Sequence, residues 1–126
     1  MKLRYLIPAV LWLSVITWLS VIPNLQLPSV KFFAPDKLGH AGVYGLLSWL
    51  LLWGFARAQA AKGAHISARE TGGILAFAAA YGVLMEFVQY AFIPGRYYEY
   101  GDMLANASGA VLGWLAFRLF SRRKYP

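Results

Sequence analysis

Four long apolar runs, separated by short polar segments, dominate the sequence of this 126-residue chain. They cover residues 5–22, 39–57, 72–92 and 103–120. A helix of roughly 20 residues crosses the hydrocarbon core of a membrane, about 30 Å thick, so each run is long enough to span it. The pattern predicts an all-α fold, a membrane-embedded four-helix bundle that forms a single domain over residues 1–126.

The first apolar run follows a short basic start, which signal peptides and first membrane helices share. Lys2 and Arg4 precede it, and no cleavage motif of the Ala-x-Ala type follows Ile22. Because three further apolar runs come later, we interpret residues 5–22 as an uncleaved membrane-spanning helix, with cleavage as the alternative.

The composition agrees with a membrane protein. Hydrophobic residues make up 60% of the chain and charged residues 13%, with a mean hydropathy of +0.51. Soluble domains carry about 25% charged residues. The net charge of +7 would suit nucleic acid, yet the basic residues flank the apolar runs, so we assign them to lipid headgroups and predict no nucleic-acid partner. Cysteine is absent, which excludes disulfides and thiolate metal sites.

Lysine and arginine are distributed unevenly between the two ends of the predicted bundle. Of the 12, three lie at one end, Lys31, Lys37 and Arg96, and the other nine lie beside the termini and the segment between the second and third runs. The positive-inside rule therefore places both termini in the cytoplasm, and residues 23–38 and 93–101 outside. We expect a multi-pass protein of the cell inner (plasma) membrane.

Polar residues gather toward the outer ends of the last three runs, at spacings that put them on one face of each helix. They are Asp36, His40 and Tyr44 on the second, Glu86 and Gln89 on the third, and Asp102 and Asn106 on the fourth. An ionisable residue at the centre of a membrane helix costs roughly 2.5–3.5 kcal/mol on insertion scales. We therefore expect the three faces to converge on one another rather than to face lipid.

Small residues follow the same faces and predict close helix approach. They are Gly82, Gly109 and Gly113 on the third and fourth runs, and Ala41, Gly45 and Ser48 on the second.

Each polar residue has a functional and a structural interpretation. Glu86 would accept a proton or pair with a cation, or it would form a buried ion pair with Arg96. His40 would act as a general acid or base, or it would be a hydrogen-bonded interface residue. Asp102 is a third catalytic candidate, although helix capping and hydrogen bonding between helices explain it, and Asn106, equally well.

Arg96 and Lys37 together would bind an anion such as a phosphate or carboxylate. One histidine among carboxylates would suit a hard divalent cation, but no histidine pair at helical spacing supports zinc. We predict no metal and no cofactor.

Four motifs follow one another along the chain: Asp36-Lys37-x-x-His40-x-x-x-Tyr44, Glu86-x-x-Gln89, Pro94-Gly95-Arg96 and Asp102-x-x-x-Asn106-x-x-Gly109-x-x-x-Gly113. This ordered set resembles the VanZ-like family of small integral membrane proteins. The resemblance implies a relation to accessory proteins of glycopeptide (teicoplanin) resistance, and it implies no defined catalytic residue. The chain departs from the family pattern at Glu99, where a small polar residue is common.

Three functions fit these observations, and whether the protein is an enzyme stays open. The preferred one is an outward-facing polar pocket for an envelope lipid headgroup, a lipid-linked precursor or a lipoglycopeptide-like compound. Its predicted binding residues are Asp36, Lys37, His40, Tyr44, Glu86, Gln89, Arg96, Asp102 and Asn106. The alternatives are a proton- or cation-coupled transporter, as a homo-oligomer, and an assembly scaffold; the apolar inner halves of the runs count against the transporter.

Overall fold

The computed structural model describes residues 3–21, 35–92 and 100–124. Within these residues the chain forms one short 3-10 helix and four α-helices, which are Leu3–Leu6 (η1), Ile7–Val21 (α1), Pro35–Ala60 (α2), Ala68–Phe92 (α3) and Tyr100–Lys124 (α4). The predicted all-α architecture is confirmed. All four helices are long and apolar enough to cross a membrane, with η1 and α1 forming one span.

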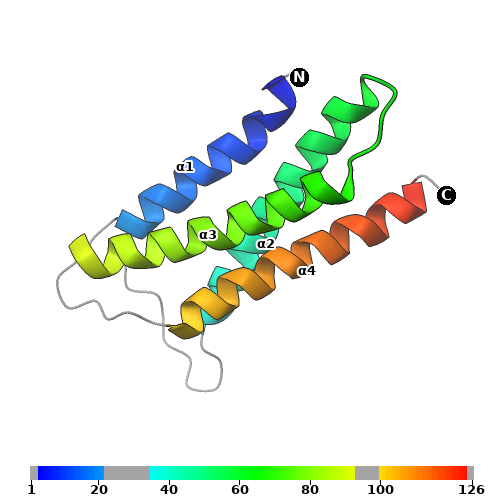
Figure 1. The fold of residues 1–126 in the computed structure, drawn as a ribbon. Coiled ribbons are helices and arrows are strands. Elements are labelled where there is room, and N and C mark those ends of the chain that lie inside the picture. The colour runs from blue at the N-terminus through cyan, green and yellow to red at the C-terminus, as the bar shows by residue number, and fades with distance from the viewer. Residues whose placement is uncertain (1–2, 22–34, 93–99, 125–126) are drawn as a thin grey trace.

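The helices alternate in direction, so both ends of the described chain and the α2–α3 connection lie at the same end of the bundle (Figure 1). The most extensive contact joins α2 and α4, and α3 packs against both. On the other side, α1 contacts α2 and α3 but is out of contact with α4 within the described residues. Arg4, Arg57, Lys62, Arg69 and Arg118 all belong to the end that holds the termini.

Helix α2 continues past the predicted end at residue 57 to Ala60, where a Schellman motif terminates it. Gly63 adopts a φ of 73°, which a residue without a Cβ atom tolerates. Its N–H donates to the Ala60 carbonyl at 3.0 Å, and the Ala64 N–H donates to the Gln59 carbonyl at 2.9 Å. These two bonds satisfy carbonyls that the helix end would otherwise leave without donors.

Helix α3 begins at Ala68, earlier than the predicted residue 72, because Ser67 and Glu70 form a capping box. The Ser67 hydroxyl accepts the Glu70 backbone N–H at 3.0 Å and donates to the Glu70 carboxylate at 3.0 Å. Gln59 also donates to this carboxylate, at 2.8 and 3.0 Å, which ties the end of α2 to the start of α3. The Ser-x-x-Glu spacing is a start signal for a helix, which our assignment of a polar loop had missed.

Small residues bring α2 and α4 into backbone contact, as predicted. A Cβ atom placed on Gly109 would lie 2.6 Å from the Cα atom of Ala41, and one placed on Gly113 would overlap the Gly45 carbonyl. Ser48 is fully buried in this seam and donates a hydrogen bond to the Ala110 carbonyl at 2.8 Å. Close packing and hydrogen bonds between helices replace the hydrophobic driving force that a membrane does not supply.

Helix α1 is joined to the other helices by polar contacts as well as by packing. The indole N–H of Trp12 donates to the Val43 carbonyl at 2.9 Å, and the hydroxyls of Thr17 and Tyr81 hydrogen-bond to each other. Much of the remaining α1 surface is apolar and exposed, with Leu11 and Trp18 among its most exposed side chains. Such a surface suits contact with lipid.

We expect Gly109→Ala to destabilise the bundle by about 1–3 kcal/mol, because the added methyl group must displace the backbone of α2. Gly42→Ala is the matched control, because a Cβ atom there meets nothing within 4 Å. An alanine in an open helical position stabilises by roughly 0.5–1 kcal/mol. Thermal unfolding in detergent measures both effects. Equal changes of melting temperature in the two variants would contradict the close backbone contact between α2 and α4.

The charge asymmetry predicts which end of the bundle faces the cytoplasm. The chain lacks cysteine, so a single introduced cysteine reports its own position. We expect Tyr100→Cys to react with a membrane-impermeant maleimide in intact cells, and Ala61→Cys to react only after permeabilisation. Both positions are exposed, and the reverse labelling would overturn the predicted orientation.

Candidate functional site

Polar side chains from three helices lie in the half of the bundle opposite the termini. We call this group the polar cluster; it consists of His40 and Tyr44 on α2, Glu86 and Gln89 on α3, and Asp102 and Asn106 on α4. The side chains of Glu86, Asp102 and Asn106 are among the largest that are fully buried in the described structure. The structure describes the side chains of six of the nine predicted binding residues, and among these six it places His40 in contact with Asp102.

Asp102 lies at the start of α4, and His40 lies on α2 beside it. Asp102 lies in the first turn of α4, where a carboxylate is favourable beside the helix N-terminus. Its Oδ2 lies 3.6 Å from Nε2 of His40, and the Asp102 side chain is 3% exposed whereas that of His40 is 23% exposed. His40 is therefore the member of this pair that a solute or a lipid reaches.

Glu86 lies deeper, between α3 and its neighbours. It is 1% exposed, and both Glu86 and Tyr81 lie within electrostatic range of the Tyr44 hydroxyl. Tyr81 continues this chain of polar groups to α1 through its hydrogen bond with Thr17. The hydrogen bond between Thr17 and Tyr81 therefore links α1 to α3.

Asn106 faces α3 at a point where α3 has no side chain. A Cβ atom placed on Gly82 would lie 2.8 Å from both Cβ and Nδ2 of Asn106, so glycine is required there for the amide to fit. The Oδ1 atom of Asn106 is buried, and no described residue donates a hydrogen bond to it. A buried acceptor without a donor costs roughly 1–3 kcal/mol.

The remaining predicted site residues are not placed by the structure. Arg96, and Glu99 beside it, lie outside the described residues, and for Asp36 and Lys37 the description covers the backbone of α2 alone. The predicted ion pair between Glu86 and Arg96 and the predicted anion site of Arg96 and Lys37 thus stay predictions. Among the described side chains, no three His, Asp or Glu residues converge as metal ligands.

A large cavity lies at the other end of the bundle, and sequence reasoning assigned it no function. Its volume is about 1010 Å³, and its lining comes from α2, α3, α4 and the α2–α3 connection. From the sequence, its basic residues, Arg57 and Arg118, are assigned to lipid headgroups. No local sequence pattern predicts a pocket whose lining comes from three helices and a loop.

Comparison with known proteins gives one match. A family model described as VanZ/LLP1 matches residues 5–121. No curated protein and no solved structure matches the chain.

We expect the contact between His40 and Asp102 to appear as a coupling energy of about 1 kcal/mol, within the 0.5–3 kcal/mol typical of contacting residues. A double-mutant cycle measures this energy by comparing the free energies of unfolding in detergent of wild type, His40→Gln, Asp102→Asn and the double variant. A second cycle pairs Asp102→Asn with His65→Gln, which lies at the opposite end and should show no coupling. Additive losses of stability in the first cycle would show that His40 and Asp102 do not interact.

Proposed function

Because this chain belongs to the VanZ/LLP1 family, which the match over residues 5–121 shows, we propose that it is a multi-pass membrane protein that binds an envelope lipid or lipid-linked compound at the polar cluster. The ligand class includes lipid headgroups, lipid-linked precursors and lipoglycopeptides such as teicoplanin, to which the resemblance points. His40 carries the proposal, because it is 23% exposed beside the buried carboxylate of Asp102 and is therefore the residue at which a ligand reaches the cluster.

The chemistry of the cluster defines the part of the ligand that it takes. The carboxylates of Glu86 and Asp102 accept hydrogen bonds, and together with the Asn106 amide they suit ammonium or hydroxyl groups. The predicted anion site of Lys37 and Arg96 suits a phosphate or carboxylate. A zwitterionic or polyol headgroup carries both kinds of group, which is why this class is preferred over a simple anion.

The surroundings of the cluster favour approach from the membrane. His40 is the partly exposed member, and large apolar side chains lie close to it and to Asp102 in sequence. Leu38 is 59% exposed and Leu104 is 70% exposed, so both present apolar surface to acyl chains. A lipid whose chains lie against these residues would present its headgroup to His40.

We expect Glu86→Gln to weaken binding of extracted envelope lipids and of teicoplanin to the purified protein about tenfold, since it removes one buried charged acceptor (about 1.4 kcal/mol). Glu70→Gln is the matched control, because Glu70 caps α3 at the opposite end and glutamine preserves a capping box. For the predicted anion site, Arg96→Ala is the test variant and Arg69→Ala is its control, and binding of the same ligands is measured.

Melting temperature, measured on the same samples, separates binding from a scaffold role. A scaffold predicts that binding and melting temperature fall together in Glu86→Gln, whereas a binding site predicts weaker binding in a protein that melts normally. Equal binding by wild type, Glu86→Gln and Arg96→Ala would remove the proposed pocket. Proton flux into liposomes that Glu86→Gln abolishes would instead favour the transporter.

A further inference from the structure

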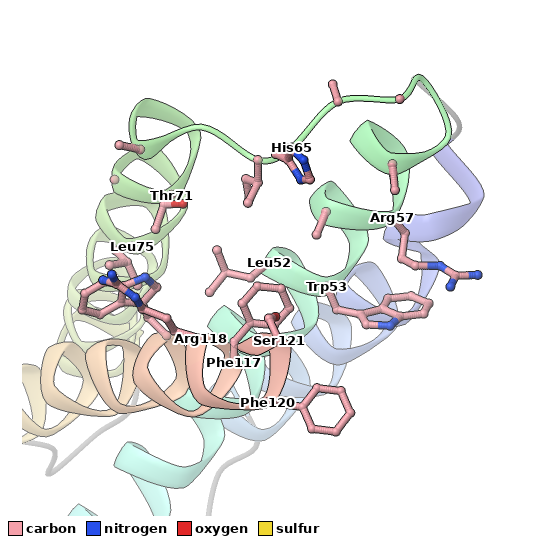
Figure 2. Close-up of a pocket in the computed structure, with 18 residues that line it drawn as sticks. Leu52, Trp53, Arg57, His65, Thr71, Leu75, Phe117, Arg118, Phe120 and Ser121 are labelled. Carbon is pink, nitrogen blue, oxygen red and sulfur yellow. The ribbon is translucent and has the colours of Figure 1, made fainter. Parts of the chain in front are cut away.

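The cavity at the end of the bundle that holds the termini is separate from the polar cluster. Figure 2 shows Leu52 and Phe117 facing its middle, His65 on the connection above it, and Arg57 and Arg118 on opposite flanks. Its volume of about 1010 Å³ is at the upper limit of small-molecule pockets, roughly 300–1,000 Å³. The space is therefore large enough for a substantial ligand.

The cavity is deep relative to the membrane. Its lining on α2 extends from Leu52 to Ala60, which corresponds to about 12 Å along the helix axis at 1.5 Å per residue. One leaflet contributes about 15 Å of the hydrocarbon core. A cavity that begins at the helix ends and reaches this depth matches the position of an acyl chain whose headgroup lies at the surface.

The lining combines apolar side chains with positive charge. Besides Leu52 and Phe117, it includes Trp53, Leu75 and Trp114, whereas its charged residues are Arg57 and Arg118, with no acidic residue among those that line it. An apolar interior suits hydrocarbon, and arginines at its flanks suit a negatively charged headgroup.

Both guanidinium groups lie at cation–π distance from aromatic rings. Arg57 lies 5.7 Å from the ring centroids of Trp53 and Tyr5, and Arg118 lies 5.7 Å from that of Trp114. Neither arginine forms an ion pair with a described carboxylate. A cation–π contact involves the ring face and no hydrogen-bond acceptor, so the N–H donors of the guanidinium remain able to bind a phosphate.

We propose that this cavity binds an anionic phospholipid, with an acyl chain inside it and the phosphate held by Arg57 or Arg118. The positive charges at this end, which include Lys62 and Arg69, raise the local concentration of anionic lipid. By the predicted orientation the lipid comes from the cytoplasmic leaflet. The proposal does not depend on the proposed function of the polar cluster.

Two neighbouring glycines offer a matched test of the acyl-chain site. A Cβ atom on Gly72 or on Gly73 meets nothing within 4 Å, so both positions accept a larger side chain, and of the two Gly72 lines the cavity. We expect Gly72→Phe to weaken binding of phosphatidylglycerol to the purified full-length protein at least tenfold, and Gly73→Phe to leave it unchanged. Native mass spectrometry of the protein in detergent, with added lipid, measures the binding.

Variants that remove positive charge test whether the arginines bind the phosphate of the headgroup. Arg57→Gln and Arg118→Gln each remove one positive charge, as does the control Arg69→Gln, whose exposed side chain lies outside the cavity. We expect one or both of the first two to bind phosphatidylglycerol about tenfold more weakly, to the level of phosphatidylcholine with the same chains, and the control to match wild type. Glu86→Gln should also match wild type, which separates this site from the polar cluster.

Several outcomes would overturn the proposal. Equal binding of the two lipids by wild type, or equal losses in Gly72→Phe and Gly73→Phe, would indicate annular lipid. Displacement of phosphatidylglycerol by inorganic phosphate would indicate a site for the free anion. A change of oligomeric state in Gly72→Phe with unchanged lipid binding would assign the cavity to a second copy of the chain.

Discussion

The backbone contact between α2 and α4 determines where the polar cluster and the cavity of this bundle lie. Gly109 meets Ala41 and Gly113 meets Gly45 without intervening side chains, and Ser48 closes the seam with a hydrogen bond to Ala110. In lipid, where apolar surface alone does not drive helices together, such close packing is a main source of association. The seam sets the distance between the helices on which His40 and Asp102 lie, because His40 precedes Ala41 directly.

The same two helices carry bulky residues beyond the seam, and this difference explains the cavity. Leu52 and Trp53 on α2 and Trp114 and Phe117 on α4 follow the last small pair. The α2–α3 connection covers the resulting space. One pair of helices therefore produces a tight, carboxylate-rich end and an open, arginine-flanked end, and the chemistry of each end follows from residue size as much as from charge.

Sequence reasoning succeeded where a pattern is local and failed where a feature arises from the packing of several helices. Helical spacing was sufficient to group His40 with Asp102 and to predict close approach at Gly109, because a stripe of polar or small residues in a membrane helix has to face another helix. The ends of α2 and α3 were wrong by a few residues, since charge and polarity at Arg69 and Glu70 outweighed the Ser67 capping signal. The cavity could not be predicted, because its lining residues come from four segments and each is an ordinary apolar or basic residue on its own.

Burial of two carboxylates in a membrane bundle has to be offset by their surroundings. The structure shows part of the compensation: His40 beside Asp102, the Tyr44 hydroxyl within electrostatic range of Glu86, and a helix N-terminus at Asp102. Replacing such groups by well-packed apolar residues is often neutral or stabilising, so folding alone is a weak reason for them. The proposed recognition of a polar ligand would explain two buried carboxylates near a partly exposed histidine, and the seam between α2 and α4 fixes the spacing of the helices that carry His40 and Asp102.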